Sequence, residues 1–167
     1  PDNTEAVVEA LGASYMYTSM PNKTYSMVQA VARHADENIK YVVLLDDDTM
    51  LPRGFTVLTQ LFEQDPLLAG YCPDIGVRKP LASSNLLESC INFEYRTISR
   101  ANAIRGHFYT TRFNHGVCAV YRFDRFRQIY EQNPCLPGGL PFGEDAYAGV
   151  IARRMGYRLG QDQVHTV

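Results

Sequence analysis

Short apolar runs alternate along the chain with longer segments in which apolar residues recur at helical spacing. The apolar runs predict strands near residues 14–19, 41–46, 68–72, 117–121 and 157–164. The helical patterns predict helices near residues 4–11, 24–36, 54–64, 84–100, 123–132 and 144–155. This alternation is typical of an α/β domain with a mostly parallel central sheet and helices on both of its faces.

Length and composition are those of an ordinary globular domain. The chain has 167 residues, of which 46% are hydrophobic and 20% charged, and its formal net charge is -2. This length is sufficient for one domain with a hydrophobic core, which we expect to cover residues 1–167. No apolar run approaches the roughly 20 residues of a membrane span, and no signal peptide opens the chain, so we expect this piece to be soluble by itself.

The cysteines and the chain ends add two expectations. Cys72, Cys90, Cys118 and Cys135 lie far apart without a C-x-x-C pair, which favours free, buried thiols in a reducing compartment. The sequence opens within a helical pattern and stops at or just after a strand pattern. We therefore expect it to be a piece of a longer protein.

Charge is distributed unevenly. Residues 1–77 are rich in Asp and Glu, whereas residues 78–127 are rich in Arg. This distribution suits a cleft that holds a metal and an anion together. A solvated surface with patchy charge explains it equally well.

The segment LLDDDTMLP places three aspartates directly after an apolar strand pattern. Because side chains alternate along a strand, Asp46 and Asp48 are expected on the same side, at the carboxyl end of the strand. Two carboxylates there can take Mg²⁺ or Mn²⁺, shared with substrate phosphates. Alternatively, Asp48 caps the following turn. A phosphatase of the haloacid-dehalogenase type, with its D-x-D-x-T string, is a rival for which Met50 stands at the threonine position.

The segment GGLPFGEDAYAGV delivers Glu144 and Asp145 to the start of an amphipathic helix. Acids at this position complement the helix dipole. A carboxylate held there by a glycine-rich loop could also be a general base for an attacking hydroxyl. In FNHGVCAVYR, Gly116 allows a close approach of backbone or ligand, and His115 is a candidate to face the cleft.

The helical pattern at residues 84–100 carries a wide apolar stripe. Packing against the sheet explains this stripe. The alternative is that the helix leans towards a membrane-embedded part of a parent protein.

Taken in order, these motifs resemble a family 2 glycosyltransferase of the GT-A fold, closest to the membrane-bound processive branch of cellulose, chitin and hyaluronan synthases. The resemblance runs over essentially the whole chain. It implies a partial GT-A catalytic domain, Rossmann-like, whose N-terminal strand is missing. The Q-x-x-R-W motif of processive members is also not present, which fits a fragment.

The resemblance implies a role for individual residues. Asp46 and Asp48 would contact the nucleotide-sugar and its metal, Mg²⁺ or Mn²⁺, and Lys23 of PNKTYSMVQAV would contribute to the nucleotide pocket. Asp145 would be the catalytic base with Glu144 beside it. FNHGVCAVYR, with His115 and Gly116, resembles the strand near the acceptor that ends in Tyr-Arg. Arginines of residues 78–127 could touch the diphosphate.

The activity implied is inverting transfer from a UDP-sugar donor to a growing glycan acceptor. The parent protein would be an integral membrane protein with this domain on the cytosolic face. Parts of the parent protein that are not present here would attach it to the membrane. A soluble, non-processive family 2 transferase and a non-catalytic nucleotide-sugar-binding relic are the alternatives. Nucleic acid is not expected as a partner, because no recognised binding module is present and the net charge is negative.

Overall fold

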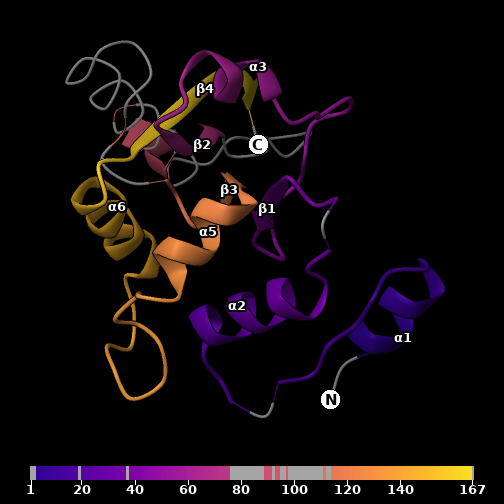
Figure 1. Cartoon of the computed structure of the whole chain (residues 1–167). Helices are drawn as coiled ribbons and strands as arrows, with labels where there is room; N and C mark the ends of the chain where they lie inside the picture. Colours follow the sequence, from indigo (N-terminus) through magenta and orange to yellow (C-terminus); the bar gives the residue numbers. More distant parts are fainter. Residues whose placement is uncertain are drawn as a thin grey trace.

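The computed structural model describes residues 3–18, 20–36, 38–75, 111 and 114–166, together with residues 89–91, 93, 94 and 97. In chain order the elements are α1 (Thr4–Ala10), α2 (Lys23–Arg33), β1 (Tyr41–Leu45), α3 (Thr59–Gln64), β2 (Leu68–Asp74), β3 (Cys118–Arg122), α5 (Phe123–Tyr130), α6 (Glu144–Arg154) and β4 (Arg158–Thr166). They form a mixed α/β structure around one four-stranded sheet (Figure 1).

The sheet is mixed, with the order β1-β3-β2-β4. β3 pairs antiparallel with both β1 and β2, and only β2 and β4 pair in parallel. The prediction of a mostly parallel sheet is therefore wrong. Three strands do run in the same direction, but β3 enters between β1 and β2 from the edge at which those strands end. Alternating helix and strand patterns indicate the elements, not the place at which a strand enters the sheet.

Helices α2, α5 and α6 cover one face of the sheet. The aromatic centre of this core is Tyr121, Phe126 and Tyr130, in which the rings of Phe126 and Tyr130 stack with centroids 4.5 Å apart. Ala148 and Ala152 of α6 are fully buried against this cluster. Small residues on α6 allow the helix to approach the sheet closely, and this fixes where its first turn lies.

The other face is covered by α3 and the segment before it. Phe62 of α3 packs with Tyr41 and Tyr71, its ring centroid 5.0 Å from that of Tyr41. Arg122 lies over the ring of Phe62 and donates hydrogen bonds to the carbonyls of Phe62 and Leu68. Helices on both faces were predicted, and this prediction is confirmed.

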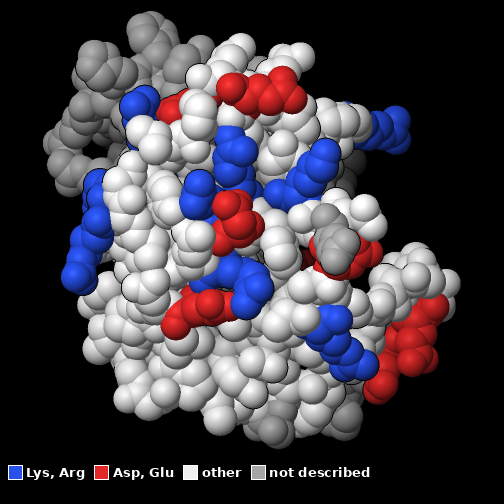
Figure 2. Space-filling view, in the orientation of Figure 1, with Lys and Arg blue, Asp and Glu red and all other residues white. Residues whose placement is uncertain are grey.

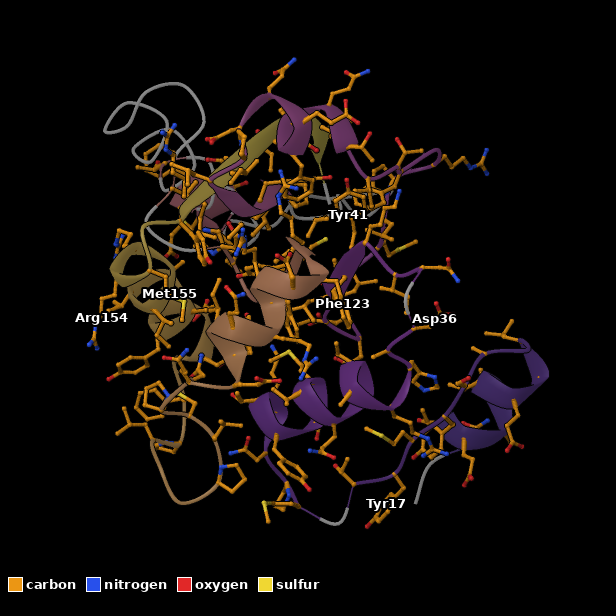
Figure 3. All side chains as sticks on the ribbon, viewed as in Figure 1. Tyr17, Asp36, Tyr41, Phe123, Arg154 and Met155 are labelled. Carbon is orange, nitrogen blue, oxygen red and sulfur yellow. The ribbon has the colours of Figure 1, made fainter. Side chains whose placement is uncertain are left out.

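Most predicted elements are found with small changes at their ends. The predicted strand near residues 14–19 is not: residues 14–18 form no strand, and Tyr17 is 80% exposed on the connection between α1 and α2 (Figure 3). An apolar run without a neighbouring strand cannot pair its backbone groups. The helix predicted to start at residue 54 begins at Thr59. The predicted helix over residues 84–100 lies mostly outside the described residues.

Two further expectations concern membranes and thiols. Within the described residues, no helix combines the length and apolar character needed to span a membrane. All four cysteines are free. Cys72, Cys118 and Cys135 are buried as predicted, whereas Cys90 is exposed.

Candidate functional site

The candidate residues meet at the edge where β1, β2 and β4 end. Asp46 directly follows β1, and residues 114–116 precede β3, which begins at this edge because it runs in the opposite direction. Helices α2 and α6 each lead through a short connection into the start of a strand, β1 and β4. Their first turns therefore lie at the far edge of the sheet, beside the ends of those strands.

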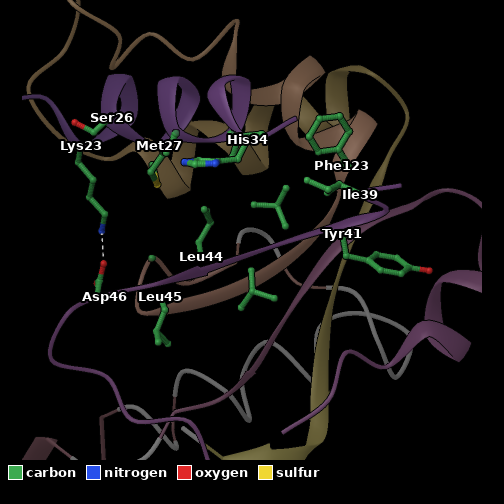
Figure 4. A pocket seen from close by; sticks show the side chains of 15 residues that line it. Lys23, Ser26, Met27, His34, Ile39, Tyr41, Leu44, Leu45, Asp46 and Phe123 are labelled. Carbon is green, nitrogen blue, oxygen red and sulfur yellow. Dashed lines mark hydrogen bonds and ion pairs between the residues drawn. The ribbon is translucent and has the colours of Figure 1, made fainter. Parts of the chain in front are cut away.

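Lys23 is the first residue of α2 and connects the two acidic segments. Its Nζ lies 2.6 Å from Asp46 Oδ1 (Figure 4). The same Nζ lies 3.3 Å from Glu144 Oε1. Partial burial alone would lower the pKa of Lys23, but Asp46 and Glu144 together outweigh it and raise the pKa. A cation at a helix N-terminus is unfavourable with respect to the helix dipole. The two carboxylates compensate for this position.

Gly116 lies within this charged cluster. A Cβ atom at this glycine would be 3.5 Å from Lys23 Nζ, 3.6 Å from Glu144 Oε1 and 3.9 Å from Asp145 Oδ2. The glycine thus leaves space for about one small group between three charged side chains. The structure therefore brings together Lys23, Asp46, Gly116, Glu144 and Asp145, five of the residues named as candidates in the sequence analysis.

The aspartate triplet is arranged differently from the prediction. β1 ends at Leu45, and Asp46, Asp47 and Asp48 form a turn in which Thr49 N–H donates to the Asp46 carbonyl. Strand alternation therefore does not place Asp46 and Asp48 on one side. Asp46 is partly buried and paired with Lys23, whereas Asp47 and Asp48 are exposed. The structure does not bring Asp48 to the ion-paired cluster.

The first turn of α6 holds Glu144 and Asp145. Gly143 precedes it in the left-handed conformation, with φ of 91°. Asn133, which is buried, donates through Nδ2 to the Glu144 carbonyl at 2.8 Å and accepts from Cys135 N–H at 3.0 Å. Sequence reasoning missed Asn133. The sequence feature that could have identified it is an asparagine in a Pro- and Gly-rich loop. The side-chain amide of such an asparagine can form hydrogen bonds with backbone groups that have no backbone partner.

His115 is partly buried and lies near the Asp145 carboxylate. Burial lowers the pKa of His115, and the nearby Asp145 carboxylate opposes the change without cancelling it. The imidazole is therefore neutral at neutral pH. A neutral imidazole can donate one hydrogen bond and accept another, so His115 suits a polar contact to a hydroxyl.

A cavity of about 490 Å³ lies between α2 and β1 and extends to the charged cluster. Lys23, Asp46 and Gly116 line its polar end, and Met27, Val42 and Leu44 belong to its apolar lining. Figure 4 shows Lys23 and Asp46 facing each other at one end of the cavity and Phe123 at the other. The cavity is large enough for a small organic ligand with one polar end.

Arginine is not gathered at the site among the described residues. Arg122, Arg125 and Arg127 lie at and beyond the end of β3, the opposite edge of the sheet from Asp46, and Arg122 is held by backbone carbonyls. The remaining arginines of residues 78–127 lie outside the described residues. On the face shown in Figure 2, acidic and basic side chains are interspersed. The expected single cleft of opposite charges is therefore reduced to the cluster around Lys23.

Comparison of the sequence with protein-family models and with curated proteins found no match. The interpretation of the site therefore depends on its geometry and on the motifs themselves.

Proposed function

We propose that this chain is part of the catalytic domain of an inverting family 2 glycosyltransferase with the GT-A fold, which uses a UDP-sugar donor. The observation that carries the proposal is the Lys23 bridge between Asp46 and Glu144. The two acidic segments are about a hundred residues apart in sequence, yet one ammonium group contacts both. A donor site and a base site of one reaction need this proximity.

Lys23 and Asp46 form the donor side in this proposal. Lys23 would turn from the carboxylates to the diphosphate when a donor binds, because the diphosphate as a whole carries two negative charges and each carboxylate one. Asp48, exposed in the same turn, would reach the donor from solvent. The cavity beside Asp46 would take the uridine.

A divalent cation fits the donor side only if protein carboxylates and the donor phosphates coordinate it together. Among the described residues, no group of three or more His, Cys, Asp or Glu side chains could enclose a metal. Mg²⁺ is commonly bound by one or two carboxylates, substrate phosphates and water rather than by an all-protein cage. Asp46 and Asp48 would hold Mg²⁺ or Mn²⁺ in this manner, and the bound cation would offset charge on the departing diphosphate.

Asp145 is the better candidate for the base. Glu144 is ion-paired with Lys23. Within the described residues, the hydrogen bond found for the Asp145 carboxylate is the one that its Oδ1 accepts from the N–H of Ala146. Asp145 would take the proton of the acceptor hydroxyl while the oxygen of that hydroxyl bonds to the anomeric carbon. The bond from that carbon to the diphosphate breaks, UDP leaves and the configuration inverts. His115 and Gly116 would lie on the acceptor side.

A polysaccharide acceptor and a membrane-bound parent protein with this domain on the cytosolic face belong to the same proposal. They are supported by the motif order alone. The soluble, non-processive transferase remains the alternative within this enzyme class.

The proposal is tested by UDP binding and by sugar transfer with Mn²⁺ present. Asp46→Asn should weaken UDP binding and its metal dependence. Asp145→Asn should retain UDP binding and lower transfer by about a hundredfold or more. Asp124→Asn is the matched control, because Asp124 is an exposed acid in the first turn of another helix, α5.

Three outcomes separate the readings. Full transfer by Asp145→Asn would remove the base assignment. UDP binding without transfer by the wild-type chain would favour a non-catalytic binding module. Absence of UDP binding would contradict the proposed function as a whole.

A further inference from the structure

The loop that leads into α6 exposes apolar side chains close to the first turn of α6, which holds Glu144 and Asp145. Phe142 is 78% exposed and Leu140 42% exposed, and Tyr147, in the first turns of α6, is 36% exposed. Exposed single apolar residues are common on proteins. These three lie within a few residues of Glu144 and Asp145, at the edge of the candidate site.

The loop is held firmly by hydrogen bonds. Leu140 N–H donates to the Pro134 carbonyl at 2.7 Å, and Cys135 Sγ donates to the Phe142 carbonyl at 3.2 Å. Asn22 Nδ2, at the start of α2, donates to the Cys135 carbonyl at 2.8 Å and thus ties the loop to the helix that carries Lys23. The backbone of Phe142 is therefore positioned by buried groups, although its ring stays in water.

Glycines shape the same loop. A Cβ at Gly139 would lie 1.9 Å from the Pro134 carbonyl oxygen, so only glycine fits there. A Cβ at Gly143 would lie 3.7 Å from Cε2 of Tyr147, so the Tyr147 ring covers the start of α6 from one side. Phe142 directly precedes Gly143 in the chain and the Tyr147 ring lies close to Gly143, so both residues border the start of α6 that carries the two carboxylates.

We propose that Phe142 and Tyr147 form the acceptor subsite of this enzyme, on which a neutral sugar ring stacks. This inference rests on the proposed function. One face of many sugar rings consists of C–H groups that carry partial positive charge, and the negative face of an aromatic ring attracts them. The sugar hydroxyls stay free for water and for Asp145.

The charges around the rings favour a neutral sugar over other occupants. In the proposed function Lys23 turns to the donor diphosphate, so Glu144 and Asp145 would repel the phosphates of a lipid surface without this counter-charge. A protein partner would need roughly 800 Å² of buried surface on each side, which three separate apolar side chains do not provide. A neutral polyhydroxy ligand has neither restriction.

The test is binding of cellopentaose and chitopentaose, measured by NMR titration of the wild-type chain with and without UDP and Mn²⁺. Phe142→Ala and Tyr147→Ala should each weaken binding by about tenfold. Phe142→Leu, which keeps an apolar side chain but removes the ring, should weaken binding almost as much, and Phe142→Tyr should restore it. Tyr17→Ala is the matched control, because Tyr17 is an equally exposed aromatic residue outside the site.

Unchanged oligosaccharide binding in Phe142→Ala, or no binding by the wild-type chain, would overturn the inference. UDP affinity is measured on the same variants and should not change, since neither ring lies in the cavity beside Asp46. If the wild-type chain binds an oligosaccharide through Phe142 but does not bind UDP, the proposed function fails and the sugar subsite stands.

Discussion

The two sides of the candidate site differ in how they are held. On the α6 side, Glu144 and Asp145 follow a loop whose backbone is tied by buried Asn133 and Cys135. On the β1 side, Asp46 lies in an open turn whose main side-chain contact is Lys23, itself about half exposed. The α6 side is therefore preorganised, and the β1 side is free to adjust to a ligand. A base must be positioned accurately, whereas a donor and its cation can complete their own site.

The largest effect on stability is expected from Asn133→Ala. The substitution removes the Asn133 amide from the Glu144 carbonyl, at a partly buried position, and from the Cys135 N–H, at a buried one. We expect a loss of about 2–4 kcal/mol in the free energy of unfolding, measured by urea denaturation. Gln132→Ala, at the exposed neighbouring position, should cost less than about 0.5 kcal/mol. Equal losses for both variants would show that the α6 side is not specially held.

A smaller effect on stability is expected from protonation of His115, which lies on the α6 side of the site. Burial lowers its pKa below the usual 6.5, so the unfolded chain binds more protons than the folded chain as the pH falls through this range. The stability contributed by the neutral imidazole is therefore present above pH 6.5 and is lost as the pH falls through the lower, folded-state pKa.

The measurement is the free energy of unfolding between about pH 5 and pH 8. His115→Gln should show a shallower loss of stability towards acid than the wild-type chain, whereas His34→Gln, at an exposed position, should follow the wild type. An NMR titration of His115 with a midpoint above 6.5 would contradict the expected direction.

Lys23→Met tests the β1 side of the site. The ion pairs are partly exposed and screened, so we expect a change of less than about 1 kcal/mol in the free energy of unfolding, which decreases further in high salt. UDP binding should nevertheless fall clearly, because the ammonium group is lost from the donor side. A large loss of stability with normal UDP binding would give Lys23 a structural role only.

Asp48→Asn should have the smallest effect on stability. Asp48 is exposed in the turn after β1, so we expect a change within about 0.5 kcal/mol. Its effect should emerge only when UDP is titrated with and without Mn²⁺. No change in the metal dependence of UDP binding would assign the cation to Asp46 alone.

The sequence by itself determined most of the elements and their chemistry. Apolar periodicity located β1, β2, β3, β4 and the helices that cover them, because burial of one face imposes the spacing of the apolar residues. The acidic segments were also identified from local pattern, whereas Lys23 was named only through the resemblance of PNKTYSMVQAV to a glycosyltransferase motif. Local predictions that failed include residues 14–18, which have no neighbouring strand, and the aspartate triplet, because β1 ends one residue before it.

Only the tertiary structure decided which of these segments meet. The entry of β3 between β1 and β2 is a long-range arrangement that no local pattern records, and it places Gly116 beside Lys23 and Glu144. Asn133 is similar: its importance comes from burial and from two backbone partners, neither visible in sequence. Local propensities specify helices and strands, whereas contacts between distant segments depend on packing of the whole chain, and the candidate site consists of such contacts.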